Sequence, residues 1–350
     1  MSAQVTIALD AMGGDHAPEM VVKGAAIARR RFPNAHFMLF GNESRILPLL
    51  KRRVKLKKRV TIHHSETMIA DDMKPSMALR NGRGSSMLMA IEAVREGQAA
   101  GVVSAGNTGA LMALSKMSLK MLPGIDRPAM AAIFPTERGE SVMLDLGANL
   151  DCDARNLMQF TVMGAAFART VLGVMRPRVG LLNVGTEEPK GNNAVREAAA
   201  GLRASELPLL DFHGFVEGDD IGAGTVDVIV SDGFSGNIAL KTVEGSVKLY
   251  TEFLRHAFRS SLASRLGYIL ARRALKKLRA RVDPRRYNGA MFVGLNGIVV
   301  KSHGGTDAFG FANAIGVTHD LAVGGFNDLI IKEIAGFGAS PQLNARVAAS

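Results

Sequence analysis

The chain has 350 residues, 47% of them hydrophobic and 21% charged, with a formal net charge of +11 at pH 7. This composition supports a large core in one α/β unit or two lobes, and it excludes a disordered chain. The single cysteine, Cys152, excludes an internal disulfide framework and a thiolate metal cluster. We expect an unprocessed cytoplasmic protein, because the first ten residues lack a basic segment followed by an apolar one. No uncharged apolar run reaches the ~18 residues that a membrane span needs.

Strand-like and helix-like segments alternate along the chain. Apolar runs predict strands within residues 5–12, 36–41, 100–106, 141–149, 179–185, 226–234 and 296–305. Helices are predicted from Pro18 to about Arg31, from about Thr108, from Ala154 to about Met175, and after Gly191, Gly236 and Thr306. Repeated strand–helix units favour an α/β fold of three layers, with a mostly parallel sheet covered by helices on both faces. We expect residues 1–350 to form a single catalytic unit, or two lobes with the site between them.

From Thr242 to Val282 the pattern contains no strand and follows helical spacing. Apolar residues form one stripe and then a second, and they shift to another face after Ala271. We expect residues 242–286 to form a helical insertion, namely a long helix followed by a bent arm that projects from the body. Between Arg255 and Arg286, eleven Lys and Arg residues accompany a single acidic residue, which suggests a docking element. A second basic cluster, Lys51–Arg59, is interpreted as a solvated surface.

Ligands of parallel α/β sheets bind beyond the carboxyl ends of the strands, so the turns at these ends are the expected place for a binding site. Six of these turns are rich in Gly, Asn, Asp and Ser. They are Asp10–Pro18, Ser104–Ala110, Asp145–Asp153, Asn183–Gly191, Ser231–Asn237 and Lys301–Gly305. One such turn indicates little, but six at equivalent positions favour a composite binding site. The turn residues that we expect at this site are Asp10, Gly13, Gly14, Asp145, Asp232 and Lys301.

These turns suit a small dense anion together with a carbonyl group that must be polarised. Several turns lead directly into a helix, so backbone N–H donors converge, as in the stretch Val102–Met117. Cations and uncharged donors also lie in or near the turns: Lys190, Lys241, Lys301, Asn107, Asn149, Asn183 and Asn237. A dinucleotide fits less well, because no G-x-G-x-x-G follows the first strand and no Walker lysine is present. Phosphate is therefore the expected anion.

Nucleophilic catalysis by a side chain has little support. No G-x-S-x-G elbow occurs, and Cys152 stands between two aspartates, which make a thiolate unfavourable. His303 is the best placed of the histidines near the turns, although a single histidine more often has a structural role. Carboxylates such as Asp145 and Asp232 are ligands of the type that magnesium prefers, but helix capping or turn bracing is the favoured interpretation. We expect neither a metal nor another cofactor.

Six sequence motifs follow one another in the order ALDAMGGDHAP, RGSSM, VSAGNTGALM, DLGANLDCD, SDGFSGNIALKTVEG and VKSHGG. They resemble those of the phosphate acyltransferases of bacterial phospholipid synthesis, the PlsX family. The resemblance runs from about Val5 to Ile331 and is loosest in the arm and past Gly336. It implies transfer of an acyl group from acyl carrier protein to inorganic phosphate, which yields acyl phosphate and the free carrier thiol. It also implies a fold similar to phosphotransacetylases and isocitrate/isopropylmalate dehydrogenases.

The resemblance further implies a homodimer that uses no metal or nucleotide and associates peripherally with the membrane. A downstream membrane glycerol-3-phosphate acyltransferase is the implied user of the product. The arm has two expected partners, the acidic acyl carrier protein and an anionic membrane surface, and the helix before it is an expected dimer interface. The residues expected to dock are Leu262, Arg265, Leu266, Ile269, Arg272 and Arg273.

Direct attack by phosphate fits these residues, because phosphate near neutral pH is largely dianionic and a thiol leaves readily. The enzyme must then position phosphate against the thioester carbon and supply donors to the developing oxyanion. The residues expected to hold phosphate are Ser104, Gly106, Asn107, Thr108 and Gly109. Lys190 is expected to neutralise phosphate or the oxyanion. Asn237 and Asn149 are expected to donate to the thioester oxygen, and His303 is expected to orient phosphate or protonate the leaving sulfur.

Three other functions stay open at this point. A nicotinamide-dependent dehydrogenase of a related fold would use NAD and a divalent metal, and its motifs are missing. A nucleic-acid-binding protein is suggested by charge alone. Its basic residues are accompanied by only two aromatics suited to base stacking, Tyr268 and Tyr287, so we expect no nucleic acid. A membrane scaffold without activity leaves the six turns unexplained.

Overall fold

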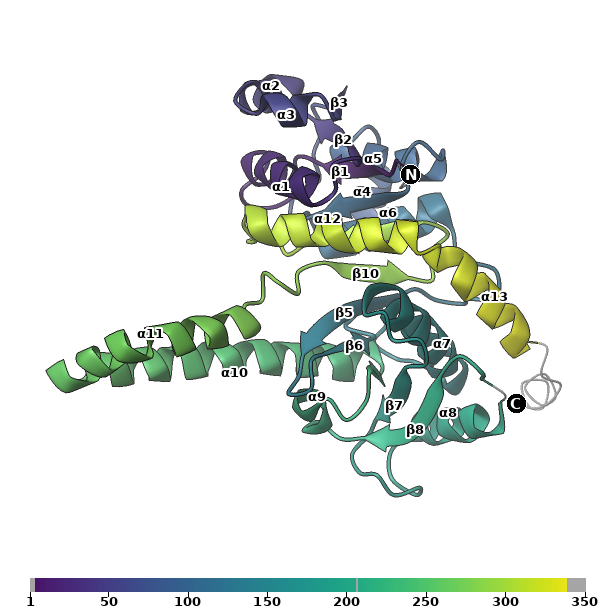
Figure 1. Ribbon diagram of the computed structural model, residues 1–350. Helices are drawn as coiled ribbons and strands as arrows, with labels where there is room; N and C mark the ends of the chain where they lie inside the picture. The colour runs from purple at the N-terminus through teal and green to yellow at the C-terminus, as the bar shows by residue number, and fades with distance from the viewer. Residues whose placement is uncertain (1–3, 206, 339–350) are drawn as a thin grey trace.

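The computed structural model describes residues 4–205 and 207–338. One mixed sheet is flanked by helices on both faces, and a pair of long helices projects from this body (Figure 1). The strands are β1 (Thr6–Asp10), β2 (His36–Gly41), β3 (Val60–His64), β4 (Gly101–Ser104), β5 (Ala129–Pro135), β6 (Glu140–Leu144), β7 (Arg178–Leu182), β8 (Asp211–Val216), β9 (Val228–Val230), β10 (Ala290–Val293) and β11 (Ile298–Lys301). The helices are α1 (Glu19–Arg31), α2 (Glu43–Lys51), α3 (Val54–Lys57), α4 (Pro75–Asn81), α5 (Ser86–Arg95), α6 (Thr108–Leu119), α7 (Ala154–Val171), α8 (Asn193–Ala204), α9 (Asp220–Ala223), α10 (Gly233–Arg259), α11 (Leu262–Arg281), α12 (Ala308–Val323) and α13 (Phe326–Gly338).

The sheet consists of two parallel groups joined by antiparallel strands. Its order is β3-β2-β1-β4-β11-β10-β5-β6-β9-β7-β8. The first strand group, β3-β2-β1-β4-β11, is parallel throughout, and so is the second strand group, β6-β9-β7-β8. Between them, β10 pairs antiparallel with both β11 and β5, and β5 pairs antiparallel with β6. Three successive reversals make the second group run opposite to the first.

Apolar residues cover both faces of the sheet. On one face α1 packs against α12, and the largest apolar cluster continues from these helices to α7 on the second strand group. On the other face α5 and α6 pack together over the first group, and a third cluster lies over β6 and β9. Most inner strands of both groups, such as β1, β4 and β9, are nearly continuous apolar runs because both of their faces are buried.

Most of the predicted elements are confirmed, with shifts at their ends. The helix expected after Pro18 is α1, and the one expected from Thr108 is α6. The helix expected after Gly236 begins earlier, at Gly233, because the Asp232 side chain accepts a hydrogen bond from the Ser235 N–H (2.6 Å) and caps it there. Helix α10 therefore starts at a site turn and continues without interruption into the insertion.

The insertion is a helical hairpin, formed by α10 and α11, that extends away from the body (Figure 1). The chain reverses at Ser260 and Ser261, where Ser261 caps α11, and the Phe258 and Tyr268 rings meet edge to face across the hairpin. The bend predicted after Ala271 is wrong, since α11 is continuous from Leu262 to Arg281. The apolar side chains change to another face of α11 after Ala271 without a bend, because no residue of α11 is buried and none has to keep facing a core.

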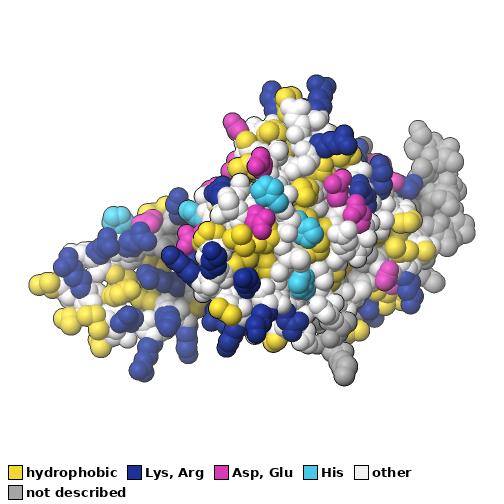
Figure 2. Space-filling view, turned by 90° about the horizontal axis from the view of Figure 1, so that it is seen from above, with side chains coloured by type: hydrophobic (Ala, Val, Ile, Leu, Met, Phe, Trp, Pro, Cys, Tyr) yellow, Lys and Arg dark blue, Asp and Glu magenta, His cyan; other side chains and the backbone are white. Residues whose placement is uncertain are grey.

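The surface of the hairpin is both apolar and basic (Figure 2). Leu262, Leu266, Ile269 and Leu270 are 63–86% exposed on α11, and Leu249, Tyr250, Phe253 and Leu254 are also exposed on α10. Lys and Arg side chains lie beside these apolar groups, and α11 contains no acidic residue. Among the described helices, none is both long enough and apolar enough to cross a bilayer.

Candidate active site

The six turns form two sets of three. The first turn set follows β1, β4 and β11 of the first strand group, and the second turn set follows β6, β7 and β9 of the second. Because these groups run in opposite directions, the turns do not form a single row along the sheet. Each of the six turns follows a strand, as predicted, but the strands that they follow belong to two groups of opposite direction. The physical cause of this reversal is the antiparallel strands β10 and β5, which the apolar pattern did not reveal.

Asp10 holds the first turn set together. Its carboxylate is buried and accepts hydrogen bonds from the Ser86 hydroxyl (2.7 Å), the Ser104 hydroxyl (2.7 Å) and the Met12 N–H (3.2 Å). Burial raises the pKa of Asp10, and these hydrogen bonds oppose the rise. A side chain at Gly13 would lie 2.6 Å from both the Asp10 carboxylate and the Gly106 nitrogen, so only glycine fits there. Asp10 is thus a brace between β1, α5 and β4.

Two of the residues expected to hold phosphate have structural roles. Ser104 is fully buried, donates to Asp10 and accepts from the Gly106 N–H (3.1 Å). The Asn107 side chain caps α6 by accepting from the Ala110 N–H (3.0 Å) and donates to the carbonyl oxygens of Asp71 (2.8 Å) and Met73 (2.9 Å). The side chains of Ser104 and Asn107 thus have other partners in this structure, and phosphate binding at these two residues stays a prediction.

The start of α6 nevertheless retains free donors. Among the described residues, the N–H groups of Thr108 and Gly109 have no hydrogen-bond partner, and the Thr108 side chain is exposed. They lie at the positive end of the α6 dipole, where an anion is favoured. Gly109 lies against Pro75 of α4, since an added Cβ would be 2.8 Å from that ring. Gly106 contributes space rather than a donor, because its N–H is bonded to Ser104.

Lys301 supplies the cation of the first turn set. It pairs with Ser104 in the parallel register of β11 and β4, and its ammonium donates to the carbonyl oxygens of Ala105 (3.0 Å) and Ser302. Burial lowers the pKa of Lys301 to about 8, although the nearby carboxylates of Asp71, Asp10 and Asp15 favour the charged form. An incoming anion would stabilise this ammonium further. His303 is exposed, and its Nδ1 accepts from the Gly305 N–H (3.3 Å).

The segment that returns from the hairpin fastens the His303 turn. The Asn288 amide donates to the Ser302 hydroxyl (2.8 Å) and the Gly310 carbonyl (2.8 Å), and its oxygen accepts from the His303 N–H (2.9 Å). Arg285 donates to Asp307 (2.7 Å), which caps α12, and to Asp283. These contacts were not predicted, because Asn288 follows the hairpin and only the tertiary structure places it beside the turn.

Asp145 organises the second turn set as Asp10 does the first. Its buried carboxylate accepts from the Met130 N–H (2.8 Å), the Ala148 N–H (3.0 Å), and both the backbone N–H (2.7 Å) and the side-chain amide (2.9 Å) of Asn149. Burial raises the pKa of Asp145 against these hydrogen bonds. The Asn149 amide also donates to the Pro128 carbonyl (2.7 Å), so both of its N–H donors are occupied. Donation from Asn149 to the thioester oxygen would need the amide to leave these partners, and it stays a prediction.

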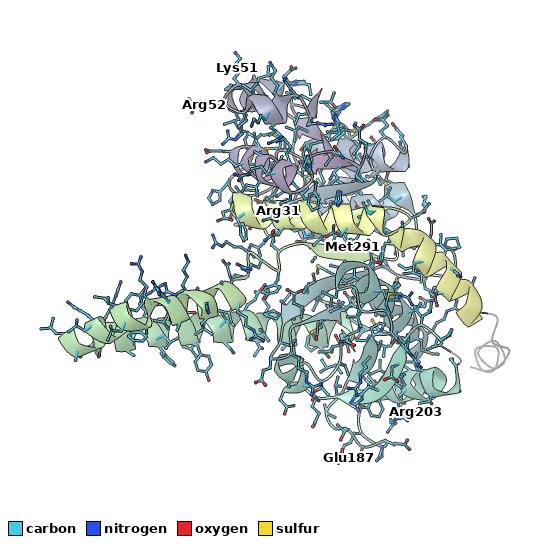
Figure 3. All side chains as sticks on the ribbon, viewed as in Figure 1. Arg31, Lys51, Arg52, Glu187, Arg203 and Met291 are labelled. Atoms are coloured by element: carbon cyan, nitrogen blue, oxygen red, sulfur yellow. The ribbon has the colours of Figure 1, made fainter. Side chains whose placement is uncertain are left out.

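Asn237 and Lys190 keep groups available for a substrate. The Asn237 amide donates to the Leu146 carbonyl (2.9 Å), which uses one of its two N–H groups. Lys190 is exposed, and within the described residues its ammonium forms no ion pair. The loop that holds Lys190 lies at the lower end of the molecule, as Glu187 shows in Figure 3, whereas α1 lies at the upper end. Lys190 thus belongs to the turn after β7, where the Asn183 amide donates to its carbonyl oxygen (3.2 Å).

Cys152 lies in the second turn set and is a poor nucleophile, as predicted. Burial, followed by the carboxylate of Asp145, raises the pKa of its thiol to about 12. The interpretation of Asp145 as a brace and Asp232 as a helix cap is also confirmed. Across residues 4–205 and 207–338, no group of three or more His, Cys, Asp or Glu side chains is arranged to hold a metal ion.

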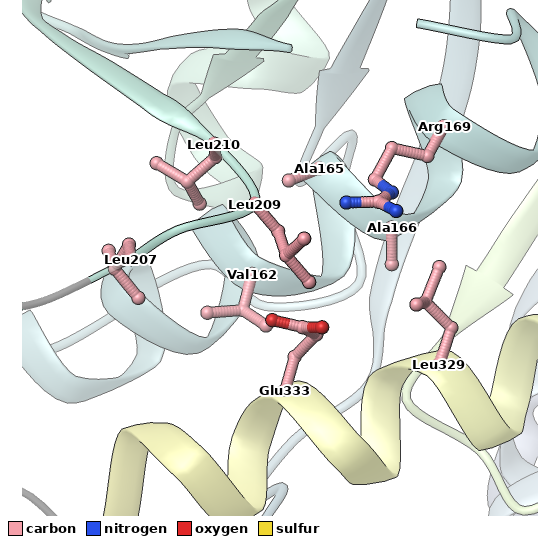
Figure 4. Close-up of a pocket in the computed structure, with 9 residues that line it drawn as sticks. All are labelled: Val162, Ala165, Ala166, Arg169, Leu207, Leu209, Leu210, Leu329 and Glu333. Atoms are coloured by element: carbon pink, nitrogen blue, oxygen red, sulfur yellow. The ribbon is translucent and has the colours of Figure 1, made fainter. Parts of the chain in front are cut away.

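A small cavity lies elsewhere, between α7 and α13 (Figure 4). Its volume is about 10 Å³, and Arg169 and Glu333 are the charged residues in its lining. None of its nine lining residues belongs to the six turns. This cavity is too small for an acyl or phosphate substrate and is not part of the candidate active site.

Comparison with known proteins identifies the family. The family model described as "Fatty acid synthesis protein" matches residues 5–329. A phosphate acyltransferase from Rhodospirillum centenum is 65% identical over 335 residues, which are 96% of this chain and 94% of that protein. A phosphate acyltransferase from Paramagnetospirillum magneticum is 62% identical over 333 residues, 95% of each chain. The chain belongs to the phosphate acyltransferases.

Solved structures show the same fold in proteins of low sequence identity. A phosphotransacetylase from Staphylococcus aureus matches this phosphate acyltransferase with a TM-score of 0.60 at 18% identity, covering 92% of this chain and 95% of that one. A phosphotransacetylase from Streptococcus pyogenes matches with a TM-score of 0.61 at 20% identity, covering 91% and 94%. The expected likeness to the phosphotransacetylase fold is thus confirmed, while the likeness to the dehydrogenases stays a prediction.

Proposed function

We propose that this phosphate acyltransferase transfers a fatty acyl group from acyl carrier protein to inorganic phosphate by direct attack of phosphate on the thioester. A phosphate oxygen forms a bond to the carbonyl carbon, the carbon–sulfur bond breaks, and the carrier thiolate leaves and takes up a proton. The products are acyl phosphate and the free carrier thiol. One observation carries this proposal: free N–H donors at the start of α6 lie next to the turn that Lys301 braces.

Phosphate is proposed to bind the N–H groups of Thr108 and Gly109 and the ammonium of Lys301. The dipole of α6 and the lysine charge both favour a dianion, and phosphate needs little help from a general base because it is already nucleophilic. The His303 Nε2 is proposed to orient phosphate or to protonate the leaving sulfur. No acyl-enzyme intermediate is needed, in keeping with the raised pKa of the Cys152 thiol.

The second turn set is proposed to hold the thioester. Asn237 would donate its remaining N–H to the thioester oxygen, and Lys190 would neutralise the developing oxyanion. The twist of the sheet supports this arrangement. Neighbouring strands are rotated relative to one another by about 20–25°. Five such steps separate β4 from β9, so the rotation between them is ~100–125°. This rotation turns the carboxyl ends of the two oppositely directed strand groups toward a common side.

The hairpin is proposed to hold the protein at an anionic membrane surface. The exposed apolar residues of α11 would enter the lipid headgroup region, and the basic residues beside them would each contribute about 1 kcal/mol of attraction. The exposed apolar residues of α10, which include Tyr250 and Phe253, are proposed to contact a second copy in a homodimer. A cytoplasmic enzyme held in this way would release acyl phosphate where a membrane glycerol-3-phosphate acyltransferase could use it.

The central test is the release of free thiol from acyl carrier protein with and without added phosphate. We expect release to rise with phosphate concentration until it saturates, and acyl phosphate to accumulate in equal amount. A rate that ignores phosphate would exclude this function. A change in nicotinamide absorbance that requires NAD and a divalent metal would instead favour the dehydrogenase alternative.

The membrane proposal has a separate test, sedimentation with vesicles that contain or lack anionic lipid. We expect co-sedimentation that requires anionic lipid and that decreases strongly when Leu266, which is 63% exposed, is replaced in Leu266→Glu. Binding that is independent of lipid charge and unaffected by Leu266→Glu would contradict the proposal. Size-exclusion chromatography with light scattering would test the homodimer, with Phe253→Asp expected to give monomers.

A further inference from the structure

A basic groove lies between α1 and the chain that joins α2 to α3. Its volume is about 570 Å³. The cationic residues along it are Lys23, Arg29 and Arg30 from α1, Arg52 and Arg53 from the joining segment, and Lys55 from α3. Apolar side chains complete its lining: Ala26, Ile27, Val54, Leu56 and Ala308. Figure 3 shows Arg52 at the outer end of this part of the molecule.

The Glu19 carboxylate, whose pKa is lowered chiefly by Lys23 and further by Arg53 and Arg52, offsets part of the groove's positive charge, but most of the groove's cations have no ion-pair partner among residues 4–205 and 207–338. Lys23 forms an ion pair with Glu19 (2.5 Å), and Arg53 donates to the Leu49 carbonyl (3.2 Å). Within the described residues, the four remaining cations form no ion pair: Arg29, Arg30, Arg52 and Lys55. Like charges that face one another across a concave surface repel, and they attract an anionic partner more strongly than the same charges would on a convex face.

The groove begins beside the first turn set. Helix α1 starts directly after the turn Asp10–Pro18, and Ala308 in the groove lining is the first residue of α12, which follows the His303 turn. From Lys23 to Arg30 the groove follows one face of α1 over about 10 Å, since an α-helix rises 1.5 Å per residue. A macromolecule bound here would therefore have one end near the proposed phosphate site.

We propose that this basic groove docks an acidic helix of acyl carrier protein, and this inference rests on the proposed function. Concave walls with cations on both sides and an apolar floor match an amphipathic helix that has acidic flanks and an apolar stripe. A flat anionic membrane would reach the convex hairpin more easily than this groove. The hairpin and the groove then have different partners, the membrane and the carrier protein.

The test compares two acyl donors in the phosphate-dependent thiol-release assay. One donor is acyl carrier protein, and the other is the same acyl group on pantetheine without the protein. We expect the double variant Arg30→Glu/Arg52→Glu to lose about tenfold or more in kcat/KM with the carrier protein. Its activity with acyl pantetheine should stay within twofold of the unmodified protein. The matched control is Lys57→Glu/Lys58→Glu, which reverses two exposed charges of the same cluster outside the groove, and we expect it to keep activity with both donors.

Other outcomes separate this inference from the proposed function. Equal losses with both donors, or equal losses in the control pair, would overturn the groove as a specific dock. Unchanged carrier kinetics together with reduced binding to anionic vesicles would overturn it in favour of the membrane. Absence of phosphate dependence with both donors would overturn the proposed function itself. If the double variant is poorly folded, the neutral variant Arg30→Gln/Arg52→Gln provides the same comparison, and carrier kcat/KM should then show a weaker dependence on salt than in the unmodified protein.

Discussion

Lys301 is expected to serve phosphate binding while it lowers the free energy of unfolding, because its burial disfavours the charged ammonium. Its pKa falls from 10.5 to about 8 on folding, which corresponds to roughly 3 kcal/mol against the charged form in the folded state. Lys301→Met removes this cost but leaves the carbonyl oxygens of Ala105 and Ser302 without a donor, at about 1–3 kcal/mol. The two effects nearly offset one another, so we expect the melting temperature at pH 7 to change little. Phosphate binding should weaken, because a charge-assisted hydrogen bond contributes about 1.5–3 kcal/mol, or roughly 10- to 150-fold in affinity.

The pH dependence of Lys301 adds a second measurement. Its folded pKa is lower than its unfolded pKa, so the unfolded chain binds more protons between pH 8 and 10.5. This group therefore makes stability increase with pH across that window, and Lys301→Met should lack the increase. In the free enzyme kcat/KM for phosphate should fall as pH rises through about 8, and this fall should be absent in Lys301→Met.

The assay is phosphate-dependent thiol release, with calorimetry on the same samples. Lys116→Met, an exposed lysine on α6, is the matched control and should leave both the phosphate KM and the stability unchanged. A phosphate KM within twofold of the unmodified protein in Lys301→Met would refute the assignment. A large loss of stability with normal kinetics would show that Lys301 is a structural residue.

Three further variants test other parts of the site. Lys190→Ala should lower turnover by about 10²–10³-fold without unfolding the protein, and near-normal turnover would remove it from the active site. Asn107→Ala should lower the free energy of unfolding by at least ~1 kcal/mol in denaturant titration, because it removes the α6 cap and the donors to Asp71 and Met73. Cys152→Ser should retain turnover. In the unmodified protein the Cys152 thiol should resist alkylation at pH 8, because burial raises its pKa to about 12. Fast alkylation accompanied by loss of activity would contradict that result.

The local elements were predictable because their signals are local. The N-cap Asp232, the buried strand β4 and the glycine-rich turn that opens α6 each act over a few residues, and each is visible in the printed sequence. The ordered motifs also indicated the family, which the comparisons confirm over residues 5–329. The basic, apolar character of the insertion likewise follows from composition and spacing alone.

The tertiary structure decided which of the turn residues are free. Ser104, Asn107 and Asn149 have side chains suited to anion binding, but their donors are occupied by acceptors in other segments of the chain. A sequence shows which hydrogen-bonding groups a residue has, whereas only the fold shows which of them are already satisfied.

The arrangement of the turns also required the fold. The apolar runs of β1, β4 and β6 predict parallel strands but not their direction relative to one another. That direction depends on β10 and β5, strands whose antiparallel pairing joins residues more than 150 positions apart, as Met291 pairs with Ala131. Strand direction is set by long-range backbone pairing, which leaves little trace in side-chain periodicity. The sequence by itself thus determined many of the elements and the family, while the tertiary structure decided the antiparallel strands, where the turns lie and which of their groups can meet a substrate.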